Sequence, residues 1–144
     1  KFVLAHGLKV RFWGVRGSIS CSGAEYARYG GNTSCLEVTA GGRRLIFDAG
    51  TGLRQLGDSL MKSPPVSATL LFSHLHWDHV QGLPFFTPLL RPGSILDVYG
   101  PAQGDGVTVE EAPIKRAIST TPVVKPIRIT APNSVFALGN ALSK

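Results

Sequence analysis

Apolar and polar residues follow one another along the chain in patterns that predict a sheet with a few helices. The segment 68–73 is a continuous apolar run, which is typical of a strand buried on both faces. Gly41 and Gly42 separate two strand-like segments and predict a tight hairpin turn. The predicted strands are 8–14, 35–40, 43–50, 68–73, 94–100, 123–130 and 134–138.

Helical spacing occurs in two segments between these strands. Residues 51–62 carry leucines at one face, and Thr51 is the expected N-cap. Residues 108–119 have a similar but weaker pattern, and 83–90 are expected to form a short helical turn or packed loop. The Gly- and Ser-rich segment 14–34 predicts a long loop. Strands mixed with helices predict an α/β fold with α+β layers in one domain, 1–144.

Composition narrows the class of protein. The chain has 144 residues and 43% apolar content, and no apolar stretch is long enough for a membrane span. The first residues lack the features of a signal peptide and are expected to be a ragged start before the strand at 8–14. The net charge of +6 suits an anionic substrate, phosphate above all, and equally a plain basic surface.

The two cysteines are too few for a disulfide framework and fit a reducing cytosol. We therefore expect a cytoplasmic protein. Cys35 is expected to be a small buried apolar residue at the start of a strand.

The segment "SHLHWDHVQG", 73–82, holds three of the four histidines in the chain. His74 and His76 are two positions apart and can point the same way from an extended segment. Asp78 and His79 can converge on a neighbouring point if a turn or helix begins there. The pattern suits two metal ions in one pocket, and imidazole with carboxylate suits Zn²⁺, with Mn²⁺ or Fe²⁺ as alternatives. A lone histidine such as His6 is more often structural.

Several separated motifs occur together with this cluster: "FWGVRGSIS", "RYGGNTSCLEV", "LIFDAGTGLRQLG", "LLFSHLHWDHVQGLPFF" and "VYGP". In this order they resemble the metallo-β-lactamase fold superfamily. The nearest resemblance is to its bacterial branch of cyclic-phosphodiesterase-like and phosphoribosyl cyclic phosphate hydrolases. The tRNA 3′-end-processing ribonucleases are more distant relatives. The resemblance spans 8–101, whereas 106–144 match weakly.

The resemblance implies an αββα sandwich, of which this chain covers mainly the N-terminal αβ half. It implies that His74 and His76 bind a first metal ion and that Asp78 and His79 bind a second, with zinc expected at both. It also implies that Asp48 orients an imidazole by accepting its other N–H. A turn-forming Asp before Gly is the alternative for Asp48.

Three residues that precede the strand at 35–40 are candidates for substrate binding. Asn32, Thr33 and Ser34 could offer donors to a phosphate, and the alternative is a strand-entry loop. Trp77 is expected either beside the site, at its rim, or in the core.

The implied activity is metal-assisted hydrolysis of a phosphodiester or cyclic phosphate through a metal-bound hydroxide, with Asp78 as ligand and proton acceptor. The substrate would be a phosphate-containing small molecule or RNA, and no membrane partner is expected. Two alternatives stay open. One is hydrolysis of another ester, a thioester or a lactam at the same site. The other is a catalytically incomplete metal-binding or interaction module.

The pattern departs from the family after the cluster. Family members carry a further His, a bridging Asp and a last His in a second half, but no histidine follows His79 here. Asp97 and Asp105 are the later aspartates, and neither lies in such a motif. The chain could be a fragment, could complete its site with another copy or chain, or could be a degenerate relative. An apolar sheet face would be left exposed, so a homo-oligomer or completion by another chain is expected.

Overall fold

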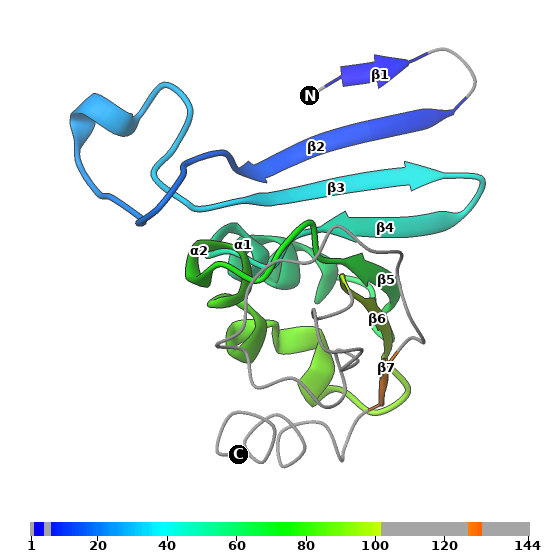
Figure 1. Ribbon diagram of the computed structural model, residues 1–144. Helices are drawn as coiled ribbons and strands as arrows, with labels where there is room; N and C mark the ends of the chain where they lie inside the picture. Colours follow the sequence, from blue (N-terminus) through cyan, green and yellow to red (C-terminus); the bar gives the residue numbers. More distant parts are fainter. Residues whose placement is uncertain (1, 5–6, 102–126, 131–144) are drawn as a thin grey trace, which may run out of the picture.

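The computed structural model describes residues 2–4, 7–101 and 127–130. Their strands form one mixed sheet (Figure 1). Its seven strands lie side by side in chain order: β1 Phe2–Leu4, β2 Leu8–Gly14, β3 Cys35–Ala40, β4 Arg43–Phe47, β5 Ser67–Leu71, β6 Ile95–Tyr99 and β7 Ile127–Thr130. The pairs β4–β5 and β5–β6 are parallel, and the other neighbouring pairs are antiparallel.

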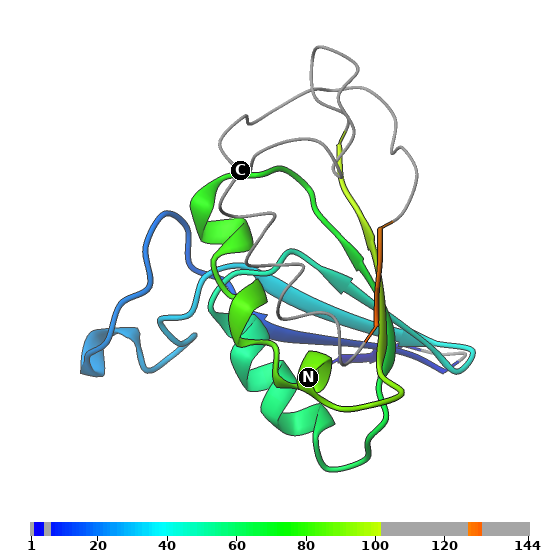
Figure 2. The same cartoon turned by 90° about the horizontal axis from the view of Figure 1, so that it is seen from below.

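The two parallel pairs require crossover connections, and these supply the helices. The α1 helix, Gly52–Leu60, connects β4 to β5. The second crossover contains α2, Trp77–Val80, and the 3-10 helices η2, Leu83–Phe85, and η3, Thr87–Leu90. Both crossovers cover the same face of the sheet (Figure 2). A further 3-10 helix, η1 Ala24–Tyr26, lies in the β2–β3 loop that projects from the sheet (Figure 1).

The hydrophobic core lies between the sheet and these helices. Leu53 and Leu56 of α1 are fully buried, as are Ile46 of β4 and Leu70 of β5. Each such side chain removed from water contributes about 1.5–3 kcal/mol to stability, so this layer holds α1 against the sheet. The helix predicted over 51–62 is thereby confirmed in its position and its buried face.

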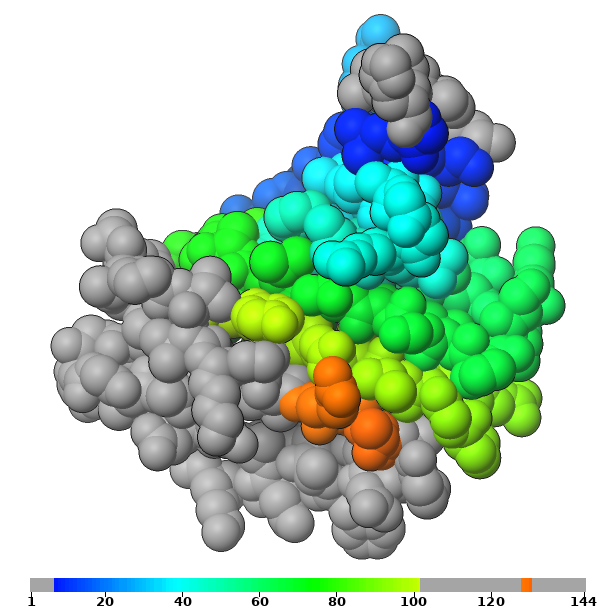
Figure 3. Space-filling view, turned by 90° about the vertical axis from the view of Figure 1, so that its right-hand side faces the viewer, coloured from blue at the N-terminus to red at the C-terminus, as the bar shows by residue number. Residues whose placement is uncertain are grey.

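The opposite face of the sheet carries apolar side chains in register. Phe47 pairs with Leu71, and Leu71 pairs with Tyr99 across the parallel strands. These residues are partly exposed. Figure 3 shows β4 to β7 side by side on this face, and no helix of the described segments lies over them. An apolar face of this kind is what the sequence led us to expect.

A polar and aromatic cluster closes the helix-covered face beyond α1. Glu37, only 9% exposed, accepts hydrogen bonds from Trp13 Nε1 at 3.1 Å and from Arg44 Nε at 2.8 Å. The Arg11 guanidinium lies 3.8 Å above the Trp13 ring. The buried carboxylate therefore has two donors, which offset its desolvation.

The five strands predicted between residues 8 and 100 agree with the structure apart from their ends, and the α/β class is confirmed. The segment 83–90 forms two 3-10 helices, as expected of a run broken by prolines. From the predicted strand 123–130, residues 127–130 form β7. The predicted helix at 108–119 and strand at 134–138 lie outside the described residues, as do His6 and Asp105.

One expectation about the first half of the chain was wrong, and another held only in part. Phe2–Leu4 is no ragged start, because it pairs with β2 through Phe2 and Val10. Thr51 is the N-cap residue of α1, as expected, but its side chain makes no capping bond. Its hydroxyl instead accepts from the backbone N–H of Thr33 at 2.9 Å, which draws the β2–β3 loop onto the start of the helix.

Cys35 is fully buried at the start of β3, as the sequence predicted. Burial raises the pKa of its thiol to about 12, and the nearby charges of Glu37 and Asp48 act in the same direction. The thiol is therefore protonated at neutral pH and serves as an apolar core group. Among the helices of the described residues, none is long and apolar enough to cross a membrane.

Candidate metal centre

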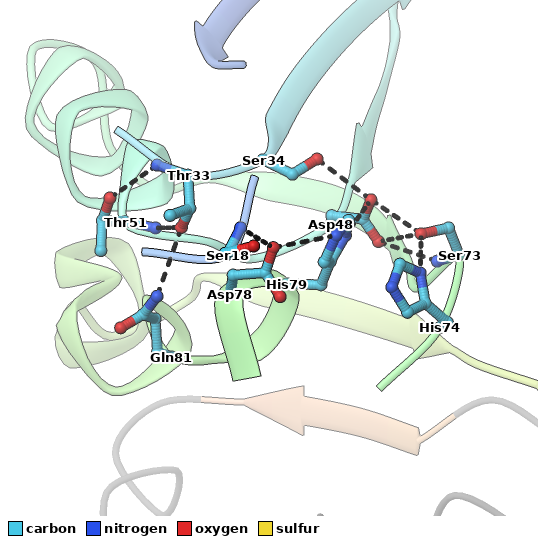
Figure 4. Close-up of polar contacts among 10 residues, drawn as sticks. All are labelled: Ser18, Thr33, Ser34, Asp48, Thr51, Ser73, His74, Asp78, His79 and Gln81. Atoms are coloured by element: carbon cyan, nitrogen blue, oxygen red, sulfur yellow. Dashed lines mark hydrogen bonds and ion pairs between the residues drawn. The ribbon is translucent and has the colours of Figure 1, made fainter. Parts of the chain in front are cut away.

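The ends of β4 and β5 bring the candidate residues to one edge of the sheet. Because the two strands are parallel, their carboxyl ends lie side by side, and Asp48 N donates to Leu71 O at 2.9 Å. Asp48 follows β4 directly, and the segment from Ser73 to His79 follows β5. Figure 4 shows Asp48 between His79 and Ser73.

The structure brings the four predicted metal ligands together. The ring centroids of His74 and His79 are 3.9 Å apart, and those of His74 and His76 are 4.6 Å apart. Asp78 Oδ2 lies 3.4 Å from His79 Nε2. Three imidazoles and a carboxylate thus share one small region. Their role as ligands stays a prediction.

Asp48 makes polar contacts with Ser73 and His79 in this region. It is a non-glycine residue with a φ of 62°, it is 6% exposed, and its Oδ1 accepts from both Ser73 N and Ser73 Oγ at 2.8 Å. Its Oδ2 lies 2.8 Å from His79 Nδ1. That nitrogen is buried and has no partner in hydrogen-bond geometry, so the contact is a close polar one and the carboxylate lies off the N–H direction. Asp48 thus lies beside an imidazole of the cluster without forming the predicted N–H hydrogen bond, and its orienting role stays a prediction.

Ser73 connects Asp48 to a second imidazole, a role the sequence did not reveal. Its hydroxyl donates to Asp48 and lies 3.0 Å from His74 Nδ1. The hydroxyl has a single proton, which it donates to Asp48. Toward His74 Nδ1 the hydroxyl can therefore act only as an acceptor, and this requires a proton on Nδ1. That tautomer leaves Nε2 of His74 with a free lone pair. The one signal in the sequence is a hydroxyl residue directly before the first histidine.

Asp78 receives a hydrogen bond from the β2–β3 loop. Its Oδ2 accepts from the backbone N–H of Ser18 at 2.9 Å, across 60 positions of sequence. Ser18 has a φ of 68°, a conformation that is uncommon for residues other than glycine. Backbone donors carry no sequence signal, which is why this contact could not be predicted.

Two glycines allow α2 to lie directly on the turn after β4. Ala49 N donates to His79 O, and Gly82 N donates to Ala49 O, both at 2.7 Å. A Cβ at Gly82 would lie 2.0 Å from Gly50 O, and one at Gly50 would lie 2.4 Å from Asp78 O. The absence of side chains at these positions therefore sets the spacing between the helix that carries Asp78 and the strand end that carries Asp48.

The three residues proposed for substrate binding take part in the same framework. Thr33 is fully buried, and its hydroxyl accepts from Thr51 N at 2.9 Å. Asn32 Oδ1 accepts from Thr51 Oγ1 at 3.1 Å, and Ser34 Oγ donates to Asp48 Oδ2 at 3.2 Å. Binding of substrate stays a prediction for all three, and burial argues against it for Thr33.

Charge and burial favour the neutral form of the His74 imidazole. Partial burial, together with repulsion by His79 and His76, places the pKa of His74 below its ordinary value of 6.5, although Asp48 and Asp78 act in the opposite direction. A neutral imidazole has the free lone pair that a metal ligand needs.

The chemistry of this donor set fits a divalent metal ion. His74, His79 and Asp78 offer two imidazoles and a carboxylate. His79 Nδ1 faces Asp48 and His74 Nδ1 faces Ser73. Ligand imidazoles commonly have a polar neighbour at the ring nitrogen that does not bind the metal. The ligands are not prearranged, however. Within the described ranges, no three His, Cys, Asp or Glu side chains stand in an arrangement that could hold a metal ion. Side-chain rearrangement would therefore have to accompany binding.

A family model described as "Beta-lactamase superfamily domain" matches residues 43–143, more than two thirds of the chain. A solved structure from Thermotoga maritima, described as a "putative metallo-beta-lactamase", aligns with 19% identity and a TM-score of 0.35. The alignment covers 56% of this chain and 40% of that chain. No curated protein matches the sequence.

Proposed function

The chain belongs to the beta-lactamase superfamily, and from this premise we propose that it is a metal-dependent hydrolase acting on a phosphodiester or cyclic phosphate. The membership agrees with the predicted metallo-β-lactamase fold, of which the chain has the N-terminal αβ half. The observation that carries the proposal is the gathering of three imidazoles and Asp78 at the ends of β4 and β5, with Asp48 and Ser73 behind them.

We assign the metal ligands to His74, His76, Asp78 and His79, with zinc as the expected ion and manganese or iron as alternatives. A bound divalent ion would supply Lewis acidity and a water molecule of lowered pKa. Ser73 would hold the ring of His74 through Nδ1, and Asp48, which lies 2.8 Å from His79 Nδ1, would hold the ring of His79 once the two groups align, leaving Nε2 of each ring for the metal.

Asp78 has a second task in this proposal. The Ser18 N–H bound to Oδ2 fixes the plane of the carboxylate. The other oxygen, Oδ1, would accept the proton of the attacking water. Asp78 as a whole is only 9% exposed.

The choice of a phosphodiester rests on charge and on sequence motifs. A net charge of +6 attracts anions, and the motifs over 8–101 resemble those of cyclic-phosphodiesterase-like hydrolases. A lactam, a thioester or another ester remains the alternative on the same residues, because a fold does not fix its substrate. A metal-binding module without catalysis is the second alternative.

The substrate assignment predicts a clear result in a hydrolysis panel. The purified protein, supplied with Zn²⁺ or Mn²⁺, should cleave bis-p-nitrophenyl phosphate or a cyclic nucleotide and leave a chromogenic lactam intact. Chelation should abolish the activity and added metal should restore it. Cleavage of the lactam alone would favour the alternative substrate, and tight metal binding with no hydrolysis would favour the non-catalytic module.

We also propose that a second copy or another chain covers the sheet face over which no helix of the described residues lies, and completes the site. No histidine follows His79 in the sequence, whereas Phe47, Leu71 and Tyr99 line a partly exposed apolar face. Light scattering should accordingly give a molar mass of at least twice the 15.3 kDa of one chain. A monomer that binds metal and hydrolyses substrate would contradict this part of the proposal.

The compartment that we propose is the cytoplasm. Cys21 and Cys35 are both free in the structure. Free thiols are typical of a reducing environment.

A further inference from the structure

Trp77 is exposed at the candidate metal centre. It begins α2 between His76 and Asp78, and 66% of its surface is accessible, so it lies at the surface beside the proposed ligands and not in the core. A large aromatic side chain left in water gives up the free energy that burial would provide. Its covalent neighbours, His76 and Asp78, are both proposed ligands, so Trp77 is an exposed aromatic residue in the same short segment as the candidate site.

A second exposed apolar residue lies in the β2–β3 loop, at the point where this loop contacts α2. The hydrogen bond from Ser18 N to Asp78 Oδ2, 2.9 Å long, places Ile19 next to one partner and Trp77 next to the other. Ile19 is 65% exposed. The carbonyl oxygen of Ile19 accepts from Arg16 Nε at 3.0 Å, and the Arg16 guanidinium lies 4.5 Å above the Tyr26 ring. The turn that presents Ile19 is thus held in place from both sides.

We propose that Trp77 binds a planar aromatic group of the substrate by stacking, with Ile19 against the edge of that group. The substrate class is then a nucleotide, whose phosphate lies at His74–His79 and whose base lies on the indole. This inference rests on the proposed phosphodiester hydrolysis and adds the part of the substrate that is not hydrolysed. Stacking on an aromatic side chain contributes about 1–3 kcal/mol per base, which is about 5- to 150-fold in affinity.

The chain has two tryptophans, so the Trp13→Phe variant would leave Trp77 as the sole indole. We would titrate this variant, with added Zn²⁺, with AMP and with ribose 5-phosphate, which has the sugar and phosphate but no base. AMP should quench the fluorescence and ribose 5-phosphate should not. In calorimetry, Trp77→Leu should weaken AMP binding about 10-fold and leave ribose 5-phosphate binding unchanged. Trp77→Phe should retain most of the affinity.

Phe85→Leu is the matched control, because Phe85 is also an exposed aromatic residue, at 62%, in the same crossover. It should bind AMP as the wild type does. Equal affinity for AMP and ribose 5-phosphate, or unchanged AMP binding in Trp77→Leu, would overturn the inference. Hydrolysis of bis-p-nitrophenyl phosphate that persists in that case would leave the proposed function intact. Quenching by AMP without any phosphodiester hydrolysis would instead reject the proposed function and keep the base-binding role.

Discussion

Asp48→Ala is expected to destabilise the fold and to weaken metal binding together. The buried carboxylate accepts from Ser73 N, Ser73 Oγ and Ser34 Oγ and lies against His79 Nδ1. Its removal leaves these groups without an acceptor, which costs about 3–5 kcal/mol. Denaturant unfolding would measure the loss. Metal affinity should fall about 10- to 100-fold, because the rings of His74 and His79 would no longer be held.

Asp48→Asn separates charge from shape at the same position. Asparagine tolerates the φ of 62° and keeps one oxygen acceptor. We expect Asp48→Asn to lose less stability than Asp48→Ala, about 1–2 kcal/mol. Its metal affinity should fall nearly as far as that of Asp48→Ala. Equal stability of Asp48→Ala and the wild type would show that the carboxylate does not hold this edge of the sheet.

The second large effect is expected from Gly82→Ala. The new Cβ would lie 2.0 Å from Gly50 O and 2.9 Å from Ala49 O, both backbone atoms that no rotamer change can move. The helix α2 would have to shift away from the turn after β4, at a cost of about 3 kcal/mol. Because α2 carries Asp78 and His79, metal affinity should fall with stability.

Gly17→Ala makes the same chemical change where there is space. A Cβ at Gly17 would have no neighbour within 4 Å, and its φ lies outside the left-handed region. Its melting temperature should stay within a degree or two of the wild type or rise slightly. If Gly82→Ala melted at the same temperature as Gly17→Ala, the close packing of α2 on the β4 turn would be refuted.

The sequence predicted those parts of the fold that depend on local pattern. Apolar runs and alternation located β2 to β6, and the leucine spacing located α1, because burial on one face sets these periods. The grouping of His74 to His79 also followed from the sequence, since four donors in six positions at a strand end lie close together whatever the rest of the fold.

The contacts that hold the site were harder to foresee, because they join distant segments through groups without a signature. Ser18 acts through its backbone N–H, and Thr51 exchanges its expected capping bond for one with Thr33. Gly50 and Gly82 are needed only because two backbones approach closely. Such contacts depend on tertiary packing, which local periodicity does not encode.

The measurement that tests the account most directly is the divalent metal content of the purified protein, by elemental analysis, beside His76→Ala and Asp78→Ala. We expect bound metal, zinc foremost, in the wild type and a clear loss in each variant, with Gly17→Ala as a control that keeps it. Metal content unchanged in both site variants, or a wild-type protein that takes up no divalent ion when it is supplied, would contradict the assignment of this cluster as a metal centre.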